Sequence, residues 1–189
     1  MADPLTAIVV AGGRASRLGG IDKPALELDG VSLLARAVAA AHAVGARAVA
    51  VGPERPGVAA EWAREDPPFG GPVAAIAAGL PRVDTDWVLV LAADLRRPDA
   101  AVAALITAEP GEDGCVLTDP VRRPQWLCAI YRAAALRAAL ASLGNPAGAS
   151  MKQLLDGLRL TRHPVPAEVI ADIDTEADVR SAGLTDRDS

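Results

Sequence analysis

The sequence has few aromatic residues and few cysteines. Its 189 residues include three tryptophans, one tyrosine and one phenylalanine, although 51% of the chain is hydrophobic. The interior must therefore be mainly aliphatic, which suits parallel strands covered by helices. Cys115 and Cys128 are the only cysteines, and neither lies in a CxxC motif or near a histidine. A zinc site or a redox pair is thus not indicated, and we expect two buried free thiols.

The sequence also lacks an excess of positive charge and a long apolar run. It has 19 lysines and arginines against 24 acidic residues, a net charge of −5, and they are spread along the chain. No basic face that would bind nucleic acid or anionic lipid is predicted. The first apolar run follows Asp3 and ends at Gly12 and Gly13, which is too short to cross a bilayer. We therefore expect a soluble, cytoplasmic protein with neither a nucleic-acid nor a membrane partner.

Short apolar runs predict the strands, and helices are expected between them. Continuous apolar runs are typical of strands that are buried on both faces. They cover residues 6–11, 48–51, 87–93, 115–117 and 125–131, with a weaker one at 169–173. The helices are expected over residues 33–44, 72–79, from about 99, 132–143 and 151–158, with a last short one after Thr175. Ser32 is the expected N-cap of the first helix, and Val102, Leu105 and Ile106 are expected on the inner face of the third.

This alternation predicts the α/β class, with a Rossmann-like, doubly wound and mostly parallel sheet. The length fits a single domain, since domains hold about 100 to 200 residues. We expect it over residues 1–183, followed by a flexible tail over 184–189. Ligands of such sheets bind at the carboxyl ends of the strands, beside the switch in strand order. That rule points to the loop after Ala11 and to Asp94, which ends the strongest apolar run.

The loop from Gly12 to Lys23 is rich in glycine and carries two arginines and one lysine. Its spacing matches neither GxxxxGK[ST] nor GxGxxG, so a Walker-type ATPase or an ordinary dinucleotide site loses its main support. Glycines can expose backbone N–H groups to a phosphate, while Arg17 and Lys23 can neutralise its charge. On composition alone, a solvated surface turn explains the loop equally well.

The stretch resembles the signature (L/V)AGGxSxRxGxxK of the molybdenum cofactor guanylyltransferase family, whose members share a nucleotide-diphospho-sugar transferase fold. The residues in register are Ala11, Gly12, Gly13, Ser16, Arg17, Gly19 and Lys23. Relatives that use cytosine nucleotides tend to carry Ala-Ala-Gly at residues 11–13, so the resemblance implies guanine. The similarity continues through Glu65-Asp66, Gly70-Gly71-Pro72, Asp94, Arg123-Pro124-Gln125 and Asp172-Ile173-Asp174-Thr175.

The resemblance implies transfer of GMP from GTP to the terminal phosphate of molybdopterin, with loss of pyrophosphate. It makes Asp94 a ligand of Mg²⁺, the cofactor, and places Arg17 and Lys23 on the triphosphate; these three are the expected catalytic residues. It also implies partners among molybdenum cofactor biosynthesis proteins or molybdoenzyme chaperones. The implied nucleotide contacts are Val10, Ala11, Gly12, Gly13, Arg17, Lys23, Gly52, Asp66 and Asp94.

The chain departs from the family pattern at two places. Arg96 and Arg97 follow Asp94 where relatives carry CDMP, and they could bind an acceptor phosphate or repel the metal. Asp172 and Asp174 replace two asparagines, and either could be a second metal ligand. Two alternatives therefore stay open: a transferase that uses another phosphate acceptor, with GTP or CTP as donor, or a nucleotide-binding module whose active site has drifted.

Overall fold

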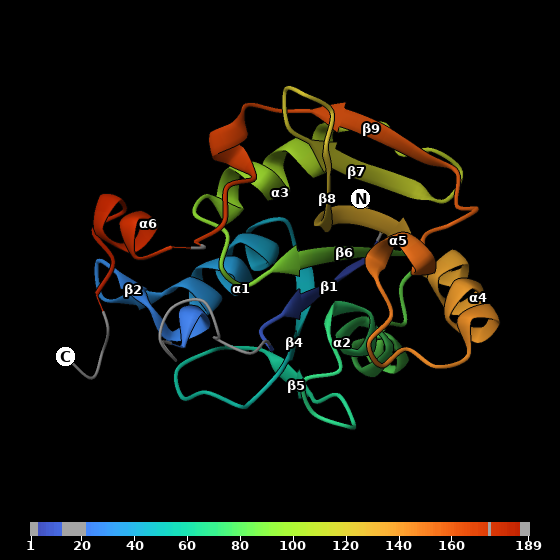
Figure 1. Ribbon diagram of the computed structural model, residues 1–189, viewed down its shortest axis with the longest axis horizontal. Helices are drawn as coiled ribbons and strands as arrows, with labels where there is room; N and C mark the ends of the chain where they lie inside the picture. The colour runs from blue at the N-terminus through green and yellow to red at the C-terminus, as the bar shows by residue number, and fades with distance from the viewer. Residues whose placement is uncertain (1–3, 13–21, 174, 186–189) are drawn as a thin grey trace.

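A seven-stranded sheet forms the centre of the computed structural model, which describes residues 4–12, 22–173 and 175–185 (Figure 1). The strand order is β5-β4-β1-β6-β8-β7-β9. All strands run parallel except β8, which lies antiparallel between β6 and β7. The strands are β1 (Leu5–Val10), β4 (Ala46–Val51), β5 (Glu61–Ala63), β6 (Trp87–Ala92), β7 (Gly114–Thr118), β8 (Pro124–Arg132) and β9 (Leu160–Pro164). The expected mostly parallel, doubly wound α/β fold is confirmed.

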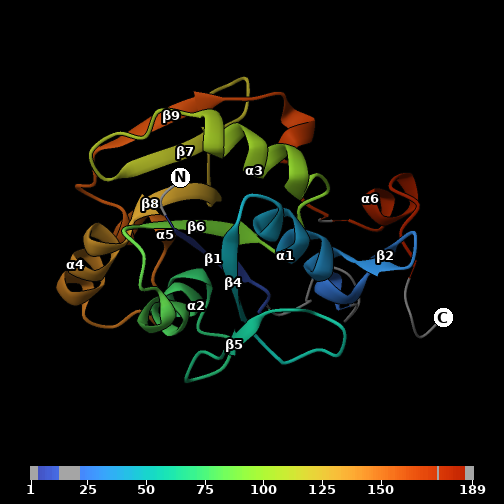
Figure 2. The ribbon, with the colours of Figure 1, turned by 180° about the vertical axis from the view of Figure 1, so that it is seen from behind.

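Helices cover both faces of the sheet (Figures 1 and 2). One face packs against α2 (Pro72–Gly79), α4 (Ala133–Leu143) and α5 (Met151–Leu154). The other packs against α1 (Leu33–Ala43) and α3 (Pro98–Thr107). Alternate residues of each central strand enter the two layers, as a period of two requires: Ile8 faces α2, and Val9 faces α1.

Smaller elements lie around the carboxyl edge of the sheet. The 3-10 helix η1 (Lys23–Ala25) leads into a hairpin of β2 (Glu27–Leu28) and β3 (Val31–Ser32). The last helix, α6 (Glu176–Ser181), packs near this hairpin in a small apolar cluster with Leu26 and Leu33. Two further 3-10 helices are η2 (Leu80–Arg82), which precedes β6, and η3 (Ala167–Val169), which follows β9.

Among the described residues, no helix is both long and apolar enough to cross a membrane.

The caps and most elements agree with the sequence, and three expectations are wrong. Ser32 caps α1, as expected, by accepting a hydrogen bond from the Ala35 N–H. Thr175 begins the expected last helix and forms a capping box with Asp178. Ile106 is 46% exposed, because the buried stripe of α3 runs through Val102 and Leu105 and leaves the next position outside. The expected strand at 169–173 does not form: η3 ends at Val169, and Asp172 makes only an isolated antiparallel bridge with Leu95. Helix α5 ends at residue 154 rather than 158.

The end of the chain is part of the packed fold as far as residue 185. Leu184, which the sequence assigned to a flexible tail, is buried beside Leu26. The Thr185 N–H donates to the Glu27 carbonyl, and the Glu27 N–H donates back to the Thr185 carbonyl. The C-terminal segment is therefore fastened to the hairpin that follows Lys23.

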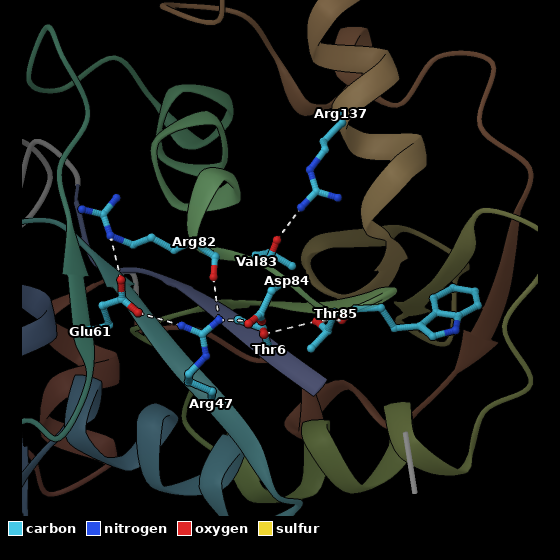
Figure 3. A network of polar contacts seen from close by, with 9 residues as sticks. Thr6, Arg47, Glu61, Arg82, Val83, Asp84, Thr85 and Arg137 are labelled. Atoms are coloured by element: carbon cyan, nitrogen blue, oxygen red, sulfur yellow. Dashed lines mark hydrogen bonds and ion pairs between the residues drawn. The ribbon is translucent and has the colours of Figure 1, made fainter. Parts of the chain in front are cut away.

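Charged residues join the strands at the edge opposite the carboxyl ends (Figure 3). Arg47, at the start of β4, donates to Glu61 Oε2 and to Asp84 Oδ1, each at 2.7 Å. Its Nη2 also donates to the Arg82 carbonyl at 2.6 Å. The hydrogen bond from Arg47 lowers the pKa of the Asp84 carboxyl below its usual value of 3.8. One guanidinium thus connects β4, β5 and the loop before β6.

Replacing Arg47 should destabilise the fold most at neutral pH. A carboxyl whose pKa is lowered by folding stabilises the protein above its unfolded pKa, and that contribution is lost as the pH falls through the folded value. Arg47→Gln should therefore lower the urea midpoint at pH 7 and do so less at pH 3. The exposed Arg162→Gln on β9 is the matched control. An equal difference at both pH values would contradict the role given to Asp84.

Candidate functional site

A cleft of about 420 Å³ opens at the carboxyl ends of the parallel strands. Its volume lies within the range of about 300 to 1,000 Å³ that is typical of small-molecule sites. The strand order brings together chain segments that are distant in sequence, which is why an open α/β sheet binds ligands at this edge. The strand ends that line it are Val10–Gly12 after β1, Gly52–Pro53 after β4, Arg64–Glu65 after β5 and Ala92–Asp94 at the end of β6.

The floor of the cleft is backbone that approaches closely between β1 and β4. A Cβ atom on Gly52 would lie 3.0 to 3.2 Å from the Ala11 carbonyl and the Gly12 nitrogen. The φ of Gly52, 153°, also favours glycine. A Cβ atom on Gly12 would lie 2.8 Å from Glu65 Oε1. Gly52 therefore favours a residue without a side chain, whereas a side chain at Gly12 would have to displace the Glu65 carboxylate. The result is a floor on which a ligand can contact the main chain directly.

A lysine and an aspartate meet at one end of this floor. Lys23 Nζ lies 3.9 Å from Asp94 Oδ2, and their side chains are 18% and 25% exposed. Lys23 is the first residue of η1, and the preceding Asp22 is bound by Arg55 through two hydrogen bonds, one of them 2.8 Å from Nη2 to Oδ1. All four residues line the cleft. The Arg55–Asp22 pair thus holds the start of η1, and with it Lys23, against the loop after β4.

A second hollow of about 300 Å³ adjoins the cleft on the side of β8. It shares Ala92, Asp94 and Leu127 with the larger cleft, so Asp94 lies where the two meet. Its other lining residues come from β6–α3, β8, α5 and the C-terminal segment: Leu95, Gln125, Trp126, Cys128, Met151, Ile170 and Asp172. The site therefore offers adjoining places for two ligands with one carboxylate between them.

Asp172 is fixed beside Asp94 by main-chain hydrogen bonds. The Ile173 N–H donates to the Asp94 carbonyl at 3.2 Å, and the Arg96 N–H donates to the Ala171 carbonyl at 2.9 Å. Two carboxylates that share a hollow suit Mg²⁺, which prefers oxygen ligands and takes one or two carboxylates together with substrate phosphates. No cluster of three or more metal-binding side chains is present in the described parts of the chain. The donor set fits a cation that arrives with a phosphate ligand.

The buried thiol and phenol near this hollow are not reactive groups. Burial raises the pKa of the Cys128 thiol to about 12, and Cys115 and Cys128 are both buried and free, as expected. Burial also raises the pKa of Tyr131, whose hydroxyl donates to the Trp126 carbonyl at 2.9 Å. A nucleophile has to ionise readily, so these residues serve packing.

The structure brings together most of the residues that the sequence assigned to the site. Six line the cleft: Val10, Ala11, Gly12, Lys23, Gly52 and Asp94. Asp66 is exposed and is not among the lining residues, whereas its neighbour Glu65 is. Arg96 and Arg97 line neither hollow. Gly13, Arg17 and Asp174 lie outside the described residues.

Sequence reasoning had given no role to four residues that line the cleft: Arg55, Arg64, Glu65 and Phe69. Strand β5 was not predicted, because its three residues are too few to form a recognisable apolar run. With β5 placed, the rule that ligands bind at strand ends would have pointed to Glu65, two residues after Ala63.

Comparisons with known proteins agree with this geometry. A model of the MobA-like NTP transferase domain matches residues 7–164. A probable molybdenum cofactor guanylyltransferase from Nostoc sp. is 32% identical and matches 93% of this chain and 88% of its own length. One from Synechococcus elongatus is 38% identical over 52% of this chain. The chain spans only about half the length of the first such relatives, 54% in the Synechococcus elongatus protein.

Solved structures show the same fold at low identity. A nucleotidyl transferase from Methanothermobacter has a TM-score of 0.73 at 22% identity, over 95% of this chain and 96% of its own. The 2-C-methyl-D-erythritol 4-phosphate cytidylyltransferase of Thermus thermophilus has a TM-score of 0.67 at 20% identity, over 95% and 97%. Since the family model covers most of the sheet and all the lining strand ends, the chain belongs to the MobA-like NTP transferase family.

Proposed function

We propose that this protein transfers GMP from GTP to molybdopterin and releases pyrophosphate. The observation that carries the proposal is the position of Asp94, beside Lys23 and between two adjoining hollows. A transferase has to hold a donor and an acceptor so that the attacking oxygen and the phosphorus meet. The relatives from Nostoc sp. and Synechococcus elongatus are named as guanylyltransferases of the molybdenum cofactor, which supports this donor and this acceptor.

The residues of the larger cleft would bind the nucleotide. Because Gly12 and Gly52 carry no side chains, the nucleotide could contact the backbone there directly. Lys23 would provide a positive charge for the triphosphate. Arg17, in the preceding loop, is proposed for the same task because the resemblance implies it. In phosphoryl and nucleotidyl transfer the protein does little covalent chemistry, so alignment and charge neutralisation provide most of the acceleration.

Asp94 would hold Mg²⁺, with Asp172 or Asp174 as a second ligand. When bound, the ion would neutralise triphosphate charge and favour the departure of pyrophosphate. Lys23, 3.9 Å from Asp94, would orient that carboxylate in the free protein. Asp94 therefore has a task whether or not the nucleotide is present.

The smaller hollow would receive the acceptor. Trp126, Leu127 and Met151 give it an apolar wall, and Asp94 and Asp172 give it two carboxylates. Because its described lining contains no lysine or arginine, a phosphate-bearing acceptor would depend on the metal or on Arg96 for neutralisation. Partners among molybdenum cofactor biosynthesis proteins or molybdoenzyme chaperones, and a cytoplasmic location, stay predictions.

A second candidate keeps the donor cleft and changes the acceptor. That candidate uses GTP or CTP with another phosphate acceptor, and a solved structure of the same fold, from Thermus thermophilus, is named as the cytidylyltransferase of a 4-phosphate. Incubation with labelled GTP and a panel of acceptors separates the two: labelled product with molybdopterin supports the proposal, and product only with another acceptor replaces it. Nucleotide binding without turnover on any acceptor would support a drifted binding module.

Replacing Asp94 should abolish turnover without unfolding the protein. Asp94→Asn keeps the size of the side chain but removes the charge that would hold the metal, so kcat should fall about 100-fold or more, as when an electrostatic stabiliser is lost. Pyrophosphate release with GTP and acceptor over a Mg²⁺ titration measures this, and thermal melting checks the fold. Release at the wild-type rate would show that Asp94 is not the metal ligand.

Replacing Lys23 should weaken GTP binding. Lys23→Ala removes a charged donor to the triphosphate. Its loss should weaken the binding free energy of GTP by about 1.5 to 3 kcal/mol, which raises the Kd about 10- to 150-fold. Titration calorimetry compares it with Lys152→Ala, which removes the chain's other lysine from an exposed site on α5. Equal Kd values for the wild type and Lys23→Ala would exclude Lys23 from the triphosphate site.

A further inference from the structure

One wall of the smaller hollow is an irregular part of β8, the strand that lies between β6 and β7 (Figure 1). The register of β8 with β6 ends at Cys128, and its register with β7 shifts between Val116 and Thr118. Residues 125–127 are therefore in register with neither neighbouring strand, and all three line the smaller hollow. Bulges of this kind turn side chains in new directions and are common beside active sites.

Trp126 is the aromatic residue of this bulged segment. It is half-buried, packs against the apolar layer that contains α4 and α5, and lines the smaller hollow but not the larger cleft. Its carbonyl accepts a hydrogen bond of 2.9 Å from the hydroxyl of Tyr131, which is fully buried. The backbone that carries the indole is therefore held in place before any ligand binds.

The remaining lining restricts what can lie against the indole. Met151 and Ile170 are apolar, and the charges come from Asp94 and Asp172, because the described lining contains no lysine or arginine. These carboxylates would repel a phosphate deep in the hollow. The phosphate of an acceptor therefore belongs at the junction with the larger cleft, where Asp94 would hold a metal ion. The part of the acceptor that lies beside Trp126 must then be neutral.

A planar heteroaromatic ring fits these conditions better than a sugar. Its polar atoms lie on its edge, so that its faces can pack against an indole and other apolar side chains. A sugar ring would bring several hydroxyl groups, and those that face apolar side chains would lose their hydrogen bonds to water without a replacement. The chemistry of the wall thus favours a flat ring.

We propose that Trp126 is a specificity-determining residue for the acceptor and stacks on an uncharged heteroaromatic ring that carries the phosphate. The pyrimidinone ring of a pterin is such a ring. Stacking on an aromatic side chain requires no particular hydrogen-bond pattern, so the bulged wall selects the class of ring. The inference rests on the proposed nucleotidyl transfer and adds the residue that distinguishes its acceptor from a sugar phosphate.

The test uses 6-hydroxymethylpterin, which has the ring but no phosphate. Titration calorimetry with the full chain should show that the wild type binds this pterin and does not bind ribose 5-phosphate at the same concentration. Trp126→Leu should raise the Kd for the pterin about 5- to 150-fold, the usual effect of losing an aromatic stacking partner. Trp126→Phe keeps a ring and should raise it less. The matched control is Trp62→Leu, at a half-buried tryptophan that lines neither hollow, and it should keep the wild-type Kd.

The donor side separates recognition of the ring from a merely structural role. Trp126→Leu should leave the Kd for GTP unchanged. With molybdopterin as acceptor it should raise the KM and leave kcat near the wild-type value, because stacking is the same in the ground state and the transition state. A weaker affinity for GTP, or a lower kcat with an unchanged KM, would show that Trp126 only supports the fold and would overturn the inference.

The remaining outcomes also decide between the two proposals. With GTP still bound by the wild type, an unchanged Kd for the pterin in Trp126→Leu, no pterin binding by the wild type, or equal affinity for ribose 5-phosphate overturns the inference and leaves the proposed transfer standing. Failure of the wild type to bind GTP overturns both.

If Trp126→Leu does not fold by circular dichroism, NMR of the indole N–H groups decides. The chain has three tryptophans, and the signal that disappears in Trp126→Phe identifies Trp126. Addition of the pterin to the wild type should shift this signal more than the other two. A smaller or equal shift would overturn the inference.

Discussion

The close approach of two backbone segments at the ends of β1 and β4 is the constraint on which the site depends. The Ala11 N–H donates to the Val51 carbonyl at 2.9 Å, which carries the parallel ladder one residue beyond the strand. Gly52 then lies so near Ala11 and Gly12 that no side chain fits between them. A larger residue at either glycine would have to separate the strands or displace Glu65. The same backbone pairing therefore extends the parallel sheet and forms the open floor of the cleft. Because this backbone is fixed, the charged groups around it also have fixed positions.

Charge is divided along this floor in a way that would give a bound nucleotide one orientation. Lys23 and Asp94 lie at the β6 end, whereas a buried carboxylate lies beyond Gly12 on the side of β5. A triphosphate placed the other way round would face Glu65 and leave Lys23 against an uncharged base. The Asp22–Arg55 pair supports this order, because it fastens η1 to the loop after β4 and so fixes where Lys23 begins.

The sequence was sufficient for the layers of the fold and for the strand ends of the cleft, because both follow from local patterns. Apolar runs located β1, β4, β6, β7 and β8. Of these, β1 ends at the loop after Ala11 and β6 ends just before Asp94, as expected. Strand β9 was missed because Thr161 and Arg162 are exposed on an edge strand and carry no apolar pattern. Glu65 needed the order of the strands, which only long-range pairing determines. The conformation of the backbone after β5 determines whether Glu65 or Asp66 lines the cleft. The sequence could not distinguish them, because they are adjacent and both acidic.

The acceptor side of the site is built from different parts of the chain than the donor side. Its walls come from β8, α5 and the segment around Asp172, and the same segment continues to Ile173 and Leu184, which pack on Leu26 just after Lys23. Among the departures from the family pattern, Asp172 lines the smaller hollow, whereas Arg96 and Arg97 line neither hollow. The floor of the larger cleft keeps Gly12 and Gly52. The nucleotidyl transferase from Methanothermobacter and the cytidylyltransferase from Thermus thermophilus share this fold. A change in α5 or the C-terminal segment would therefore alter the proposed acceptor side without disturbing the floor between β1 and β4.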